Sequence, residues 1–124
     1  MKILVVDDER DIQQLFEQRF RAEIREKLFE LVFAFSGEEA LTYMRQNDHE
    51  AVLILSDINM PGMTGLELLS EIKQKHLKPP PVFMIMTAYG DAQNYEKAKQ
   101  LGADDFLTKP IAFTQLKEKL KSLQ

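Results

Sequence analysis

The chain has 124 residues, of which 44% are hydrophobic and 29% are charged, with a formal net charge of -4 and no cysteine. This composition predicts one soluble domain over residues 1–124, without disulfides, thiolate metal sites, a signal peptide or a membrane span. The acidic balance argues against direct binding of nucleic acid or anionic membranes, and the absence of cysteine fits a reducing, cytoplasmic compartment.

The first third of the sequence predicts a strand, a helix and a second strand. Residues 2–6 are an apolar run typical of a buried strand. Apolar residues then recur at helical spacing as far as Ile24, with Asp11 as the expected cap of the helix. The side chains of residues 29–35 alternate in polarity enough to predict an edge strand.

The middle of the sequence predicts two further helices around a central strand. Ser36 followed by Glu39 is a capping-box pattern, and residues 52–56 are an apolar run that predicts a fully buried strand. A second capping box, Thr64 with Glu67, opens a helix that is expected to last until a run of three prolines.

The last third predicts two strands and two helices. Residues 82–86 are a fourth apolar run, and Asp91 is expected to cap a short helix. Gly102 lies where a left-handed residue is expected to end that helix. Residues 105–107 predict a short fifth strand. The last helix is expected to bury four apolar side chains, those of Phe113, Leu116, Leu120 and Leu123.

Strands and helices that alternate in this way predict a doubly wound α/β domain with a five-stranded parallel sheet. We expect the strand order 2-1-3-4-5, which makes the first and third strands neighbours at the switch point of the sheet. Ligands of such sheets bind at that point, beyond the carboxyl ends of the strands.

Polar residues follow four of these strands: Asp7 and Asp8, Asp57, Thr87, and Lys109. Oxygen ligands without histidine or cysteine suit a hard cation, and Mg²⁺ is the expected one. A metal ion, the Lys109 ammonium and the Thr87 hydroxyl would together neutralise a phosphoryl group in transit. Asp57 is the expected nucleophile, since a carboxylate can form an acyl phosphate.

Four motifs extend this pattern over essentially the whole chain: VVDDE at residues 5–9, SDINMPGMTG at 56–65, MTAYG at 86–90 and GADDFLTKP at 102–110. In this order they resemble the receiver domain of two-component response regulators, including the chemotaxis regulators. The resemblance implies a flavodoxin-like fold and a phosphorylation-dependent signalling switch. It implies a signalling domain that is not an enzyme, apart from catalysing its own phosphorylation and slow dephosphorylation.

The resemblance also implies a role for each site residue. Asp57 would be the phospho-acceptor, and Thr87 and Lys109 would bind the phosphoryl group. The bond between Lys109 and Pro110 is expected to be cis, and Phe106 takes the position of a switch aromatic without a hydroxyl. Mg²⁺ would be bound by Asp8, Asp57 and the main-chain carbonyl of Asn59, with Asp7 acting partly through water.

The implied partners are a histidine kinase or a histidine phosphotransfer protein as donor, and an unknown output protein or carboxyl-terminal effector domain. The surface expected to change on phosphorylation comprises residues 91–101, 105–107 and 112–123. The same surface is a candidate for a homodimer contact.

Several of these residues have a plain structural alternative. The acidic pair after the first strand could simply cap the first helix. Thr87 could be an ordinary β-branched strand residue. Asn59 and Tyr89 either tune hydrolysis of the acyl phosphate or are ordinary loop residues. His49 and His76 are each isolated in the sequence and are not expected to bind a metal or carry a phosphoryl group.

Two other classes of function compete with a signalling switch. A phosphohydrolase with an aspartyl nucleophile would want a second acid two residues later, where this chain has Asn59. A nucleotide or flavin module would want a Gly-rich loop after the first strand, where Asp7 and Asp8 would repel a phosphate.

Overall fold

The computed structural model describes residues 1–47, 50, 52–88 and 90–123, so the predictions on His49 and Tyr89 lie outside the described residues. Its five strands form one parallel sheet in the order β2-β1-β3-β4-β5, as predicted. The strands are Lys2–Val6 (β1), Glu30–Ala34 (β2), Val52–Asp57 (β3), Val82–Ala88 (β4) and Asp105–Lys109 (β5).

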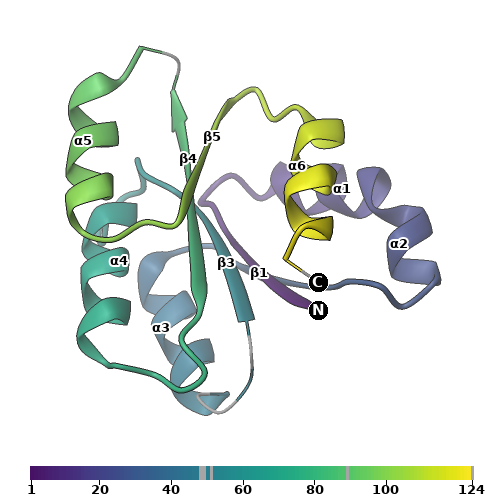
Figure 1. Cartoon of the computed structure of the whole chain (residues 1–124), viewed down its shortest axis with the longest axis horizontal. Coiled ribbons are helices and arrows are strands. Elements are labelled where there is room, and N and C mark those ends of the chain that lie inside the picture. The colour runs from purple at the N-terminus through teal and green to yellow at the C-terminus, as the bar shows by residue number, and fades with distance from the viewer. Residues whose placement is uncertain (48–49, 51, 89, 124) are drawn as a thin grey trace.

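Helices cover both faces of the sheet. In Figure 1, α3, α4 and α5 lie on one side of the sheet, and α1, α2 and α6 lie on the other. The helices are Asp11–Arg19 (α1), Arg21–Arg25 (α2), Gly37–Gln46 (α3), Gly65–Gln74 (α4), Ala92–Gln100 (α5) and Phe113–Lys121 (α6). None of the helices in the described part of the chain has the length and apolar character needed to cross a membrane.

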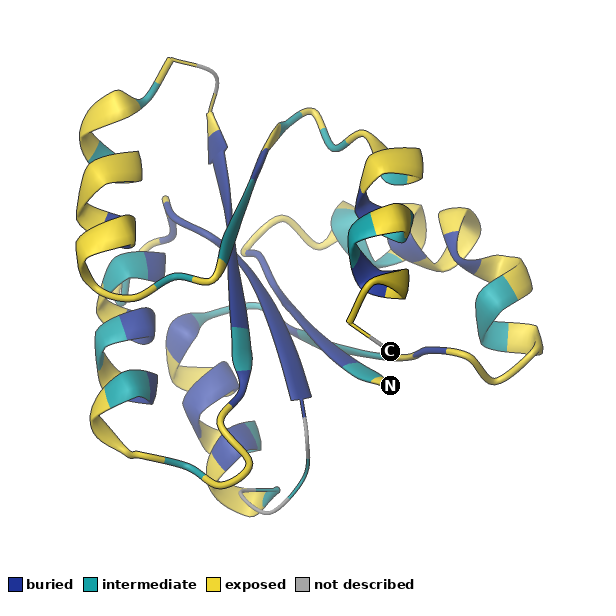
Figure 2. Ribbon diagram, viewed as in Figure 1, coloured by how far each residue is buried: buried dark blue, intermediate teal, exposed yellow. Residues whose placement is uncertain are grey.

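Each face of the sheet has its own hydrophobic core. Along β1, Leu4 and Val6 contribute to the core under α3, α4 and α5, whereas Ile3 and Val5 contribute to the core under α1 and α6. This alternation follows from the two-residue period of a strand. Because both faces are covered, the central strands β1 and β3 are buried almost throughout, as Figure 2 shows, and that burial explains their continuous apolar runs.

The helix predicted from Asp11 to Ile24 is interrupted. The structure ends α1 at Arg19 and starts α2 after Phe20, whose backbone leaves the helical region at φ -105° and ψ 16°. The Phe20 side chain is fully buried and stacks on Phe16 with ring centroids 5.9 Å apart. Tertiary packing of this ring therefore prevails over the helical pattern of the local sequence.

The predicted cap at Asp11 is wrong. The N-cap residue of α1 is Arg10, and no side chain caps this helix. Instead, main-chain carbonyls of the preceding turn accept the first amides: Ile12 N–H donates to Glu9 O at 3.1 Å, and Gln13 N–H donates to Arg10 O at 3.3 Å. Asp11 lies in the first turn, where a carboxylate interacts favourably with the helix dipole.

Other helix ends were predicted with mixed success. The capping box of Thr64 and Glu67 is confirmed, as are the Asp91 cap and the positive φ of +98° at Gly102. At the predicted box of Ser36 only half is present, because the Glu39 carboxylate accepts from Phe35 N–H instead of the cap residue.

Three other predictions differ from the structure. The helix α4 ends at Gln74, well before the prolines, and the chain turns at His76 with a φ of +49°. Leu123 is 44% exposed because α6 already ends at Lys121. The fifth strand is longer than predicted and ends at Lys109 itself, so a regular strand holds this lysine.

Candidate functional site

The carboxyl ends of four strands converge at one edge of the sheet. In the register of the ladders, Val6 pairs with Ser56, Asp57 pairs with Met86, and Lys109 pairs with Ala88. The polar residues that follow or end these strands therefore stand at the same level. The parallel sheet, and not their separation in sequence, brings them together.

Three carboxylates form the centre of the site. One oxygen from each of Asp7, Asp8 and Asp57 can be chosen so that all lie within 4.8 Å of one another. Asp7 is fully buried and Asp57 is 8% exposed, whereas Asp8 is exposed. The group thus has a buried side toward the sheet and an open side toward solvent, from which a cation can enter.

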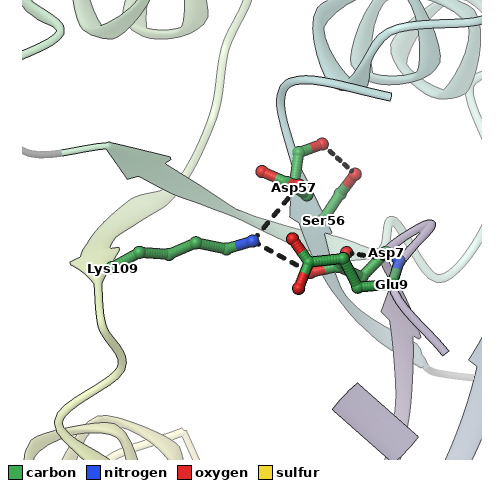
Figure 3. Close-up of polar contacts among 5 residues, drawn as sticks. All are labelled: Asp7, Glu9, Ser56, Asp57 and Lys109. Carbon is green, nitrogen blue, oxygen red and sulfur yellow. Dashed lines mark hydrogen bonds and ion pairs between the residues drawn. The ribbon is translucent and has the colours of Figure 1, made fainter. Parts of the chain in front are cut away.

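Lys109 joins two of these carboxylates. Its Nζ lies 3.0 Å from Asp7 Oδ2 and 3.2 Å from Asp57 Oδ2, as Figure 3 shows. The Lys109 ammonium thus pairs with both carboxylates at once. Burial by itself lowers the pKa of Lys109, but the two carboxylates outweigh it and leave this pKa above its ordinary value.

Asp57 is an unfavourably placed charge when no metal is bound. Burial raises the pKa of its carboxyl group, and the negative charge of Asp7 acts in the same direction. The Lys109 ammonium opposes both effects without cancelling them. One ammonium facing three carboxylates therefore leaves an excess of negative charge that a divalent cation would relieve.

Main-chain contacts fix where these side chains point. Asp7 Oδ1 accepts from Glu9 N–H at 3.0 Å, and Ser56 Oγ donates to the main-chain oxygen of Asp57 at 2.9 Å. A Cβ atom at Gly65 would lie only 2.1 Å from that same oxygen of Asp57, so only glycine fits at the start of α4.

Ser56 and Gly65 were not predicted to have a role in the site. Gly65 had a visible signal, because a glycine at the first position of a helix, directly after its capping threonine, suggests a close approach of two main chains. Ser56 carried no such signal, since a serine that ends an apolar strand has many possible partners.

The other predicted residues lie around this centre. Thr87 is 7% exposed near the end of β4, and Asn59 is exposed in the loop after β3. The bond between Lys109 and Pro110 is cis, as predicted. Phe106 is half-buried on β5 against the core under α4 and α5. The roles of Thr87, Asn59 and Phe106 toward a metal or a phosphoryl group stay predictions.

Comparison with protein families matches the response regulator receiver domain to residues 3–121. The chain belongs to this family. It is 35% identical over 122 residues to the probable transcriptional regulator ycf27 of Cyanophora paradoxa, covering 98% of this chain and 47% of the relative. It is 31% identical over 124 residues to the response regulator RppA of Synechocystis sp., covering 100% of this chain and 50% of the relative. The chain thus spans about half the length of these curated relatives.

Solved structures of the family are also similar. A putative response regulator from Chloroflexus aurantiacus has a TM-score of 0.81 at 30% identity, covering 98% of this chain and 94% of that chain. The chemotaxis protein CheY4 of Vibrio cholerae has a TM-score of 0.79 at 28% identity, covering 99% of this chain and 98% of that chain.

Family and site together define the class of function. The chain is a receiver domain of a two-component system, a signalling module rather than a catalytic enzyme. Its acidic triad of Asp7, Asp8 and Asp57 serves the acceptance of a phosphoryl group and matches the metal site of a receiver. A receiver implies a histidine kinase as partner. The phosphohydrolase and the nucleotide or flavin module are therefore set aside.

Proposed function

We propose that residues 1–124 act as one receiver domain in which Asp57 accepts a phosphoryl group from a phosphohistidine in a Mg²⁺-dependent reaction. The observation that carries this proposal is the position of Asp57 on the central strand. Its carboxylate faces Lys109 Nζ at 3.2 Å and belongs to a cluster of carboxylate oxygens that lie within 4.8 Å of one another.

The donor set fits a hard divalent cation. Carboxylate oxygens are the ligands that Mg²⁺ prefers, and the open side at Asp8 leaves room for its waters. We assign Asp8, Asp57 and the main-chain carbonyl of Asn59 as ligands, with Asp7 acting partly through water. Bound Mg²⁺ supplies positive charge that offsets the negative charge of the phosphoryl oxygens.

The protein's own groups then perform the transfer. An Asp57 carboxylate oxygen attacks phosphorus in line, a P–O bond forms, and the P–N bond to the donor breaks with its electron pair leaving on the imidazole nitrogen. Lys109, already held by Asp7 at 3.0 Å, pairs with one phosphoryl oxygen as Asp57 gives up its half of the ion pair. The Thr87 hydroxyl donates a hydrogen bond to another phosphoryl oxygen.

The donor is a histidine kinase or a histidine phosphotransfer protein, and we place the exchange in the cytoplasm. The proposed output surface consists of α5, β5 and α6, where an output protein, an effector domain or a second copy of the chain would bind. Phe106 supports this choice, because it lies on β5 with its ring centroid 4.4 Å from that of Tyr95 on α5. A change in the Phe106 rotamer would therefore move the covering helix.

Incubation with acetyl phosphate and Mg²⁺ tests the proposal. We expect one alkali-labile phosphoryl group per chain, with no sustained release of phosphate, and labelling slower by about tenfold or more in EDTA. Asp8→Ala removes a direct metal ligand, so its labelling should become insensitive to Mg²⁺ and slower by about tenfold or more. Sustained release of phosphate would indicate a phosphohydrolase, and an unlabelled wild type would exclude phosphoacceptance altogether.

Phe106→Ala tests the proposed output surface. Burying one aromatic ring is worth about 1.5 to 3 kcal/mol, which is comparable with the bias of a two-state switch. The variant should lose the change in hydrogen exchange over residues 91–123 that beryllium fluoride induces in the wild type. Its labelling rate at Asp57 should stay within about twofold of wild type, because Phe106 contacts no reacting group. An exchange response confined to residues 11–24 in the wild type would place the output elsewhere.

A further inference from the structure

The loop that follows the phospho-acceptor strand is held from the side by another helix. Met63 N–H, near the end of the loop between β3 and α4, donates to Glu38 Oε1 at 3.1 Å. Glu38 lies in the first turn of α3, 25 residues away in sequence. Beside it, a Cβ atom at Gly37 would lie 2.8 Å from the Met63 side chain, so the helix and the loop pack without a gap.

The base of this loop is fixed independently of α3. Gly65 N–H donates to Ile58 O at 2.8 Å, and the capping box of Thr64 and Glu67 fixes the start of α4. Between these points the Met60 side chain, 6% exposed, anchors the loop in the core under α3, α4 and α5, so the hydrogen bonds of the main chain are what remains to be accounted for. Among the described residues, Met63 N–H provides the only hydrogen bond from residues 59–63 to a different element.

We propose that Glu38 is a positioning residue for the metal site. By holding Met63 N–H, its carboxylate fixes the loop that carries Asn59, whose main-chain carbonyl is assigned above as a Mg²⁺ ligand. This inference rests on the proposed function. A ligand that belongs to the main chain can be placed only by fixing the main chain, and a hydrogen bond from the loop to a side-chain oxygen of a helix does that.

The neighbouring residue provides a matched control. Glu39 lies in the same first turn of α3, and its Oε1 also accepts a main-chain N–H at 3.1 Å. That N–H belongs to Phe35, at the end of β2, and not to the metal loop. Removal of either carboxylate changes the net charge and the helix terminus in the same way, but within the described residues the loop donates a hydrogen bond to Glu38 and none to Glu39.

The experiment measures Mg²⁺ affinity from amide chemical shifts as MgCl₂ is added, together with thermal unfolding in EDTA. We expect Glu38→Ala to weaken Mg²⁺ binding by about three- to tenfold. This is at or below the usual effect of removing a group that supports a metal ligand, because the hydrogen bond from Met63 to Glu38 is exposed. Glu38→Gln keeps an acceptor oxygen and, like Glu39→Ala, should stay within about twofold of wild type. All variants should unfold cooperatively, with similar stability in EDTA.

Each contrary result has a distinct meaning. Equal weakening in Glu38→Ala and Glu39→Ala would assign the effect to the helix or to charge, and would overturn the positioning role. Glu38→Gln as weak as Glu38→Ala would overturn it as well, since the charge alone would then matter. If the wild type binds Mg²⁺ and Glu38→Ala binds it equally well, only this inference fails. If the wild type shows no saturable Mg²⁺ binding, the proposed function fails.

Discussion

Asp57→Asn should reduce acyl-phosphate labelling by acetyl phosphate and Mg²⁺ to background. An amide lacks the anionic oxygen that attacks phosphorus. No other carboxylate of the site is both partly accessible and paired with Lys109. Asp7 is fully buried, and Asp8 lies on the open side without a contact to Lys109 among the described residues. The stoichiometry of alkali-labile label per chain, followed by mass spectrometry, measures the effect.

Asp104→Asn is the matched control for this experiment. Asp104 precedes β5 at the end opposite Lys109, and its carboxylate accepts from Phe83 N–H at 2.8 Å. The substitution has the same chemistry and the same change in charge, so labelling should continue at the wild-type level. If the Asp57→Asn variant is labelled at full stoichiometry on another residue, the phospho-acceptor has been assigned wrongly.

The convergence of the site could be predicted because it depends on few physical facts. Apolar runs mark buried parallel strands, and parallel strands end at one edge of the sheet. Once the order 2-1-3-4-5 is assumed, Asp7 and Asp57 must lie on adjacent strands, and the structure confirms that order. No side-chain conformation has to be known for this step, so the sequence was sufficient.

The contacts that depend on side-chain conformation could not be predicted in the same way. Lys109 is 102 residues from Asp7, and its flexible stem could reach one carboxylate or both. The bond from Met63 to Glu38 depends on how closely α3 approaches a loop, which no local pattern encodes. The break at Phe20 depends on rings brought in from elsewhere in the chain, such as Phe29 and Phe113.

Stability should show the electrostatic cost of the site before any metal binds. In EDTA at about pH 7, Asp57→Asn should raise the free energy of unfolding by roughly 1 to 3 kcal/mol. The wild-type carboxylate is desolvated and repelled by Asp7, and Lys109 compensates only part of this. Urea denaturation of both proteins measures the difference, and Asp104→Asn should show no such gain.

The dependence of this difference on pH follows from the raised pKa of Asp57. The folded protein binds a proton at Asp57 more tightly than the unfolded chain does, so lowering the pH from neutrality stabilises the wild type through this group. The gain is complete once the pH falls below the ordinary carboxyl value of 3.8, and the asparagine variant lacks it. The advantage of Asp57→Asn should therefore shrink steadily as the pH falls. Saturating Mg²⁺ at neutral pH should shrink it too, because the cation stabilises the charged form. A difference that stays constant with pH would mean that the Asp57 carboxylate is not disfavoured in the folded protein.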